Sequence, residues 1–247
     1  MATNCWQRHG IRHLSASSLA LYRNEPALWV MKYLMRVRDE AGAGAWRGTA
    51  VEGAVNKIVY ENCPDDEAIG AALAAFNETS QGDLSAEVEK ERVVIPELVR
   101  SAAAAFRPLG KPIATQFKTA LWLDGIDVPL IGYVDYLYAD VLIDLKTTLR
   151  MPSEPRFDHV VQVVSYAEAT GRAPALIYVT PKKVQRFDKD AMDTERALWA
   201  LRRTAHSIRS LLSMTRDAQD AAAVFSPNFE SFYWNDATKA AAMELWQ

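Results

Sequence analysis

The stretch IGYVDYLYADVLIDLKTT, residues 131–148, restricts the fold of this chain more than any other part of its sequence. Two apolar runs flank a short break at Ala139 and Asp140, a pattern that predicts two antiparallel strands joined by a two-residue turn. With that turn, Asp135 on the first strand lies directly opposite Asp144 on the second. A three-residue turn would remove this opposition, so the turn decides whether two carboxylates meet inside an otherwise apolar hairpin.

Side chains in a strand alternate between two faces, which separates the charged residues of the hairpin from the apolar ones. Lys146 is expected on the same face as Asp135 and Asp144. The opposite face, expected to point into a core, carries Val134, Tyr136, Ile143 and Leu145. Opposed carboxylates about 5 Å apart destabilise a sheet unless a positive charge lies between them. Such oxygen ligands suit Mg²⁺ or Mn²⁺. The alternative is an exposed hairpin face that carries an ordinary Asp–Lys pair.

The remaining segments predict a mixed α/β arrangement. Expected helices begin after Ser15, at Pro26 and near Trp46, the last after a loop over 41–45, and further helices lie within 65–107. A strand over 114–123, followed by the turn signal Asp124-Gly125, extends the hairpin to a three-stranded meander. A helix over 157–171, a buried strand over 175–180 and an amphipathic helix over 191–214 follow, and the stretch near 216–223 is expected to be loose.

Composition narrows the functional classes. The net charge of -3 gives no whole-chain attraction to nucleic acid, although residues 172–209 are locally basic. That segment indicates either a nucleic-acid-binding face or an ordinary solvated helix face. Cys5 and Cys63 are too few for a disulfide framework or a thiolate metal cluster. Because no apolar run is long enough to span a membrane and no secretory signal is evident, the expected location is cytoplasmic.

Three short motifs carry a resemblance to a known family. They are Gly132-Tyr-Val-Asp135, Asp144-Leu-Lys146 and Gln162-Val-Val-Ser-Tyr166. In order and spacing they resemble the PD-(D/E)XK nuclease superfamily, and within it the RecB-like and phage-type exonucleases. The resemblance implies an α/β restriction-endonuclease-like core, a mixed central sheet flanked by helices, with additional N- and C-terminal helices. We therefore expect one nuclease domain over 1–247, made of an N-terminal helical element (1–45), a catalytic core (46–182) and a C-terminal helical extension (183–247).

The resemblance also implies roles for individual residues. The catalytic set is Glu52, Asp135, Asp144, Lys146, Gln162 and Tyr166, and the metal ligands are Glu52, Asp135, Asp144 and the carbonyl of Leu145. Lys146 would position the attacking water. Glu52 lies in the motif WRGTAVEGAV, where many family members have histidine. A carboxylate there supplies a third hard oxygen for Mg²⁺ or Mn²⁺, whereas the alternative is an ordinary surface glutamate. An iron–sulfur cluster is not expected, because only two cysteines exist.

The function implied by the resemblance is hydrolysis of DNA phosphodiester bonds, with products that carry a 5′-phosphate and a 3′-hydroxyl. We expect an exonuclease that acts on double-stranded ends or single strands in phage-type recombination or repair, with a single-strand annealing protein as a further partner and no membrane contact. Expected DNA contacts are Arg47, Ser17, Thr147, Lys182 and Lys183. The alternatives are a structure-specific endonuclease of the same superfamily, a metal-dependent phosphatase, and a non-catalytic DNA-binding module.

Overall fold

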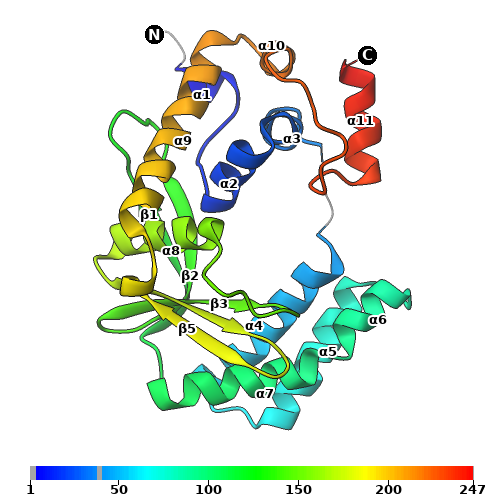
Figure 1. Cartoon of the computed structure of the whole chain (residues 1–247), viewed down its shortest axis with the longest axis vertical. Coiled ribbons are helices and arrows are strands. Elements are labelled where there is room, and N and C mark those ends of the chain that lie inside the picture. The colour runs from blue at the N-terminus through cyan, green and yellow to red at the C-terminus, as the bar shows by residue number, and fades with distance from the viewer. Residues whose placement is uncertain (1–3, 38–40, 247) are drawn as a thin grey trace. The chain divides into compact units, whose positions relative to one another are not determined.

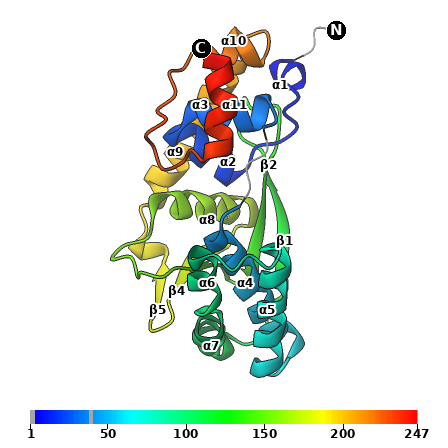
Figure 2. The same cartoon turned by 90° about the vertical axis from the view of Figure 1, so that its right-hand side faces the viewer.

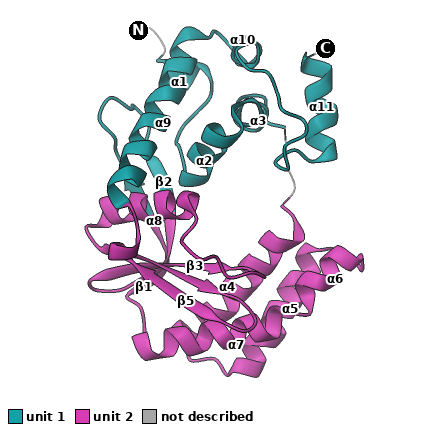
Figure 3. Ribbon diagram, viewed as in Figure 1, with its two compact units in different colours: residues 1–40, 119–132, 194–247 teal, residues 41–118, 133–193 magenta. Residues whose placement is uncertain are grey.

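The computed structural model describes residues 4–37 and 41–246. Within these ranges the chain forms two compact units, shown in different colours in Figure 3. Of the described residues, unit 1 contains 4–37, 119–132 and 194–246, and unit 2 contains 41–118 and 133–193. Among the described residues, no helix is both long enough and apolar enough to cross a membrane.

The elements follow one another as a mixed α/β chain (Figure 1). The helices before the sheet are α1 (Cys5–Arg8), α2 (Ala16–Asn24), α3 (Pro26–Trp29), the π-helical turn η1 (Val30–Leu34), α4 (Ala43–Glu61), α5 (Asp65–Thr79), α6 (Ala86–Arg92), α7 (Ile95–Phe106) and η2 (Arg107–Leu109). The strands are β1 (Ala114–Leu121), β2 (Leu130–Leu137), β3 (Val141–Thr147), β4 (Ala173–Val179) and β5 (Val184–Asp188). The later helices are α8 (Phe157–Thr170), η3 (Lys189–Ala191), α9 (Thr194–Met214), α10 (Ala218–Ala222) and α11 (Asp236–Trp246).

The hairpin at the centre of the sheet has the predicted register. Strands β2 and β3 pair antiparallel, with Tyr136 opposite Ile143 and Leu137 opposite Leu142. The amide of Tyr138 donates to the carbonyl of Val141 at 2.9 Å, which closes the two-residue turn. The same register, continued by one residue, sets the two aspartates of the hairpin opposite each other.

The five strands form one sheet in the order β1-β2-β3-β4-β5, which confirms the predicted mixed sheet. Strand β4 runs parallel to β3, so the connection between them crosses over through α8. The predicted helix end is confirmed, because Gly171 adopts the left-handed conformation (φ 70°) that ends α8. Strand β5 pairs antiparallel with β4 and was not predicted. It is a five-residue edge strand in which only Phe187 is buried, so it lacks the apolar alternation that marks a strand in a sequence.

The apolar core of unit 2 lies on one face of the sheet. It joins buried side chains of α4, α5 and α7 to Tyr136, Ile143 and Leu145, as the alternation of the hairpin predicts. Helix α8 contacts β3 and β4, and it lies on the side of these strands opposite to α7 (Figures 1 and 2). The sheet in this unit is therefore covered on both sides, and the charged face of the hairpin is turned toward α8.

Helix boundaries follow from local chemistry. The side chain of Ser15 caps α2 by accepting from the amide of Ser18, as predicted. Helix α4 begins at Ala43, three residues before the expected start, because the Ala-rich segment continues the helix and Gly42 occupies the cap position. The stretch 216–223, expected to be loose, contains the short helix α10, which is capped by the side chain of Asp217.

Candidate active site

Asp135 and Asp144 lie on adjacent strands and are both buried, with exposed fractions of 8% and 0%. The register of the hairpin places them opposite each other, on the face of the sheet that Lys146 shares. The amide of Leu145 donates to Oδ2 of Asp135 at 2.8 Å, which fixes the orientation of this carboxylate. Two carboxylates thus lie inside the protein, where an uncompensated charge is costly.

Asp144 has one cationic neighbour and an unsatisfied oxygen. Its Oδ2 lies 2.7 Å from Nζ of Lys146. This contact is an ion pair. Neither carboxylate oxygen of Asp144 accepts a hydrogen bond of good geometry from the described residues. Buried polar atoms are nearly always paired, so an oxygen without a partner needs an explanation. Oδ1 of Asp144 is therefore a candidate ligand atom for a cation.

The pKa values of the site report crowded negative charge. Burial, followed by the charges of Asp144 and Glu52, raises the pKa of Asp135 well above its usual range. Burial and then the charge of Asp144 likewise raise the pKa of Glu52. For Lys146, burial alone would lower the pKa, but the charges of Asp144 and Asp135 outweigh it and raise the pKa above its ordinary value. The three acids therefore interact, and Lys146 remains a cation at neutral pH.

A chain of hydrogen bonds connects Lys146 to α8. Nζ of Lys146 donates to Oε1 of Gln162 at 2.9 Å, and Nε2 of Gln162 donates to the hydroxyl of Tyr166 at 2.9 Å. Gln162 and Tyr166 are four residues apart and so lie on one face of the helix. Burial, followed by the charge of Asp144, raises the pKa of Tyr166 to about 12. The structure thus brings together Lys146, Gln162 and Tyr166, which the sequence predicts as members of one site.

Gln116 is a residue of this site that sequence reasoning missed. Its side-chain amide donates to Oε1 of Glu52 and, at 3.3 Å, to Oδ1 of Asp135. Its backbone has φ +48°, a left-handed conformation that residues other than glycine rarely adopt. Strain of this kind concentrates at functional sites. No signal in the sequence marks Gln116, because it lies in an ordinary alternating strand and its φ is set by the tertiary structure.

Arg47 connects α4 to the end of β3. Its side chain is buried, with 6% exposed. It pairs with Glu91 and donates through Nη2 to the carbonyl of Thr147 at 3.2 Å. Gly48 brings the helix close to the strand, since a Cβ added there would lie 3.6 Å from Oγ1 of Thr147. Arg47 is thus held by protein groups, and its predicted DNA contact stays a prediction.

The other predicted DNA contacts lie on exposed segments. Lys182 and Lys183 occupy the turn between β4 and β5, where their amides donate to Oγ1 of Thr180 at 3.3 and 2.9 Å. Their ammonium groups have no hydrogen bond or ion pair among the described residues. Ser17 belongs to unit 1, is exposed, and shares a hydrogen bond of 3.0 Å with the hydroxyl of Ser15. No described contact joins any of these three residues to Glu52, Asp135 or Asp144.

His159 is a half-buried histidine on α8. Burial, followed by the charges of Lys146 and Arg156, lowers its pKa to about 3. Its Nδ1 lies 2.7 Å from the hydroxyl of Tyr178. The imidazole is therefore neutral at physiological pH and too weakly basic to accept a proton readily.

The donor set partly fits a hard divalent cation. Carboxylate oxygens are its preferred ligands, and the partnerless Oδ1 of Asp144 beside the raised pKa of Asp135 leaves a place for positive charge. Among residues 4–37 and 41–246, however, no group of three or more His, Cys, Asp or Glu side chains is arranged to hold a metal ion. Glu52 is turned to Gln116 instead. The predicted ligand set of Glu52, Asp135, Asp144 and the Leu145 carbonyl therefore stays a prediction.

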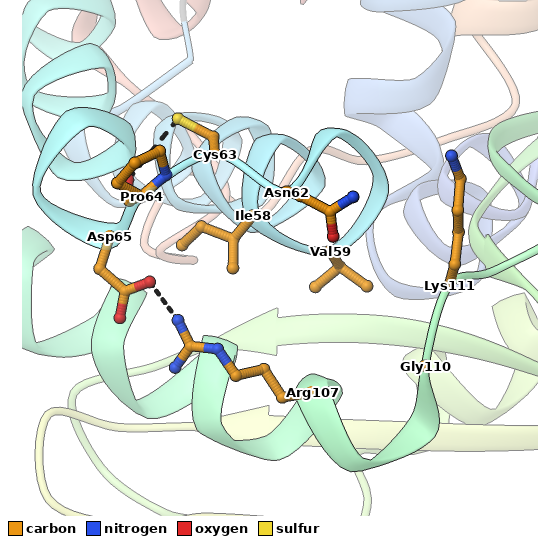
Figure 4. Close-up of a pocket in the computed structure, with 9 residues that line it drawn as sticks. All are labelled: Ile58, Val59, Asn62, Cys63, Pro64, Asp65, Arg107, Gly110 and Lys111. Atoms are coloured by element: carbon orange, nitrogen blue, oxygen red, sulfur yellow. Dashed lines mark hydrogen bonds and ion pairs between the residues drawn. The ribbon is translucent and has the colours of Figure 1, made fainter.

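A separate pocket of about 500 Å³ lies where the end of α4 meets the start of α5 (Figure 4). It is lined by Ile58, Val59, Asn62, Cys63, Pro64, Asp65, Arg107, Gly110 and Lys111. Its charged groups are already engaged, because Arg107 pairs with Asp65 and Lys111 lies 4.3 Å from the ring centre of Tyr60. None of the predicted site residues lines this pocket, so it takes no part in the proposed chemistry.

Comparisons with known proteins agree with this fold and show the family of the chain. A crystal structure of a candidate exonuclease from Eubacterium rectale is similar in fold, with a TM-score of 0.55 and 14% identity over 93% of this chain and 88% of that chain. The match to a second crystal structure, of SSO0001, covers 72% of this chain and 82% of that chain at 14% identity, with a TM-score of 0.34, which is too low to support a common fold. A search of curated proteins gave no significant match. The family model of the PD-(D/E)XK nuclease superfamily matches residues 13–231. The chain therefore belongs to the PD-(D/E)XK nuclease superfamily, whose members act on phosphodiester bonds of nucleic acids.

Proposed function

We propose that this protein is a Mg²⁺- or Mn²⁺-dependent deoxyribonuclease that degrades DNA from its ends. The observation that carries the proposal is the buried carboxylate of Asp144, which has an oxygen without a hydrogen-bond donor and lies beside Asp135 and Lys146. A protein that only bound DNA would have no use for such repulsion in its interior. Asp135 and Asp144 are the proposed ligands, together with the Leu145 carbonyl and, once Gln116 releases it, Glu52.

Lys146 acts in this proposal as a fixed positive charge. Its raised pKa keeps it protonated at neutral pH, so it cannot be the base that removes a proton from water. Its ammonium group instead orients the nucleophile and stabilises negative charge that develops on the phosphate. Gln162 and Tyr166 are positioning residues, because they hold Lys146 from α8 through two hydrogen bonds.

A divalent cation held by the aspartates would supply a Lewis acid for the phosphate and a lower pKa for a bound water. The chain itself provides the buried carboxylates of Asp135 and Asp144, the ammonium group of Lys146, and the side-chain amide of Gln116, which competes for Glu52. Gln116 donates to Glu52 and Asp135 at once, so it lowers their mutual repulsion in the metal-free protein.

Two observations support action at DNA ends, the net charge of the chain and its similarity to exonucleases. The net charge of -3 gives the whole chain little electrostatic grip on a continuous duplex. The fold is similar to that of a candidate exonuclease, and the sequence motifs resemble the RecB-like and phage-type group. We therefore favour an exonuclease in recombination or repair, which could act with a single-strand annealing protein, over a structure-specific endonuclease.

The test compares linear duplex, covalently closed circular duplex and circular single strands at equal nucleotide concentration with Mg²⁺. We expect only the linear substrate to be consumed, and we expect EDTA or the substitution Asp144→Asn to stop the reaction. Nicking of the closed duplex at a similar rate would favour the endonuclease. Binding without cleavage of any substrate would favour a non-catalytic module, and cleavage undiminished by EDTA would exclude the metal-dependent chemistry.

A further inference from the structure

Unit 1 contains a basic pocket that the proposed chemistry does not use. It has a volume of about 530 Å³ and is formed by the segment that precedes α2, the start of α2 and the segment that follows α3. The lining residues are Gly10, Ile11, Arg12, His13, Ser15, Ser18, Tyr33 and Arg36. Two guanidinium groups and an imidazole are thus combined with hydroxyl groups, and no carboxylate is among the lining residues. A pocket of this composition favours an anion.

Arg36 is fixed in this pocket at a conformational cost. Its backbone has φ 62°, at the end of the π-helical turn η1, where a left-handed residue is usually glycine or asparagine. Its Nη2 donates to the carbonyl of Gly10 at 2.6 Å. Gly10 itself has φ +68°, and a Cβ added there would lie 3.3 Å from this nitrogen. The guanidinium has no other hydrogen bond or ion pair among the described residues, so its remaining N–H groups can meet a ligand.

Arg12 and His13 are exposed and have no partner among the described residues. No hydrogen bond or ion pair joins either side chain to residues 4–37 or 41–246. The hydroxyls of Ser15 and Ser18 are used within the cap of α2, where Ser15 accepts from the Ser18 amide and Ser18 donates to the Ser15 carbonyl. The groups left to meet a ligand are therefore the nitrogen atoms of two guanidinium groups and an imidazole.

We infer that this pocket binds a phosphate group. A planar guanidinium presents paired N–H donors that match two phosphate oxygens, and two such groups can neutralise its charge, while the imidazole adds one more hydrogen-bonding nitrogen. The stacking of Tyr33 on Trp29, with ring centres 5.5 Å apart, fixes the aromatic wall beside them. The source is either a phosphodiester of a nucleic-acid strand or a terminal or free phosphate. The first source rests on the proposed nuclease function, whereas the recognition of phosphate does not.

The test measures binding by the full chain in EDTA, so that no cleavage interferes. Isothermal titration calorimetry with inorganic phosphate probes the pocket directly. Fluorescence anisotropy with 3′-labelled single strands, with and without a 5′-phosphate, distinguishes a terminal phosphate from an internal one. The variants are Arg12→Ala and Arg36→Gly, of which the second suits the left-handed backbone. The control is Arg216→Ala, an exposed arginine of the same unit that pairs with Asp220 outside the pocket.

We expect each pocket variant to weaken binding of inorganic phosphate and of the labelled strand on the order of tenfold. A loss of this size is what removal of a charge-assisted hydrogen bond predicts. The control should bind like the wild type, and thermal unfolding should show that all variants are folded. Equal phosphate affinity in the wild type and in both pocket variants would overturn the inference. A chain that binds phosphate through Arg12 and Arg36 but degrades no DNA would keep this inference and lose the proposed function.

Discussion

Substitution of Asp135 by asparagine is expected to stabilise the metal-free protein. Directly opposed residues of an antiparallel pair lie about 5 Å apart, and two unit charges at that distance repel by roughly 3 kcal/mol at an effective dielectric constant of about 20. The substitution also removes an attraction to Lys146, which at a diagonal distance of about 7 to 8 Å is worth roughly 2 kcal/mol. Asparagine can still accept the Leu145 amide, but it loses the 3.3 Å bond that Oδ1 of Asp135 accepts from Gln116. With the desolvation of one charge also relieved, a net gain of about 1 to 3 kcal/mol follows.

The dependence on pH identifies the cause. The pKa of Asp135 is raised in the folded protein, so its contribution to stability is fully present below about pH 4 and is lost as pH rises through the folded pKa. The free energy of unfolding, measured in denaturant with EDTA, should therefore differ between wild type and Asp135→Asn at about pH 8 and converge at about pH 4. Asp140→Asn, in the exposed turn of the same hairpin, is the matched control. A variant less stable than the wild type at about pH 8, or a gain independent of pH, would refute the reasoning.

Three further substitutions separate the roles within the site. Glu52→Gln should reduce Mg²⁺-dependent cleavage severely if this carboxylate is a ligand, and a wild-type rate would remove Glu52 from the ligand set. Lys146→Met should reduce turnover by roughly 10²- to 10³-fold. It should also destabilise the protein in EDTA by about 3 kcal/mol, because it leaves Asp144 buried without its cation. An unchanged turnover would exclude an electrostatic role for Lys146. Tyr166→Phe removes one hydrogen-bond acceptor from Gln162 and should raise the activation free energy by about 1 kcal/mol, or roughly fivefold in kcat with little change in KM. A larger change in KM than in kcat would indicate that Tyr166 contacts the substrate instead.

The hairpin was predictable because its information is local. Its apolar alternation predicts the face of each side chain, and its short break predicts a two-residue turn, from which the pairing of Tyr136 with Ile143 follows. Helix α8 was predictable for a similar reason, since its apolar spacing ends at a glycine that suits a left-handed cap. The connection of Lys146 to Gln162 followed only from the family resemblance, because it joins two separate elements.

The parts that escaped prediction depend on tertiary context. Gln116 contacts Glu52 across 64 positions of sequence, and its left-handed backbone has no local signature. Strand β5 is stabilised by pairing with β4 and buries only Phe187, so no periodic pattern marks it. Arg36 was equally invisible, because an arginine is not the residue expected at a left-handed position.

The crossover between β3 and β4 gives the site an order of assembly during folding. A hairpin with a two-residue turn forms in about 1 to 10 μs, whereas parallel pairing waits for a longer loop to close. We therefore expect Asp135 and Asp144 to approach each other before α8 brings Gln162 to Lys146. Repulsion met this early slows folding, and contacts made after the rate-limiting step slow only unfolding. In stopped-flow experiments with EDTA, Asp135→Asn should accelerate refolding and Tyr166→Phe should accelerate unfolding, and the reverse assignment would show that the hairpin closes last.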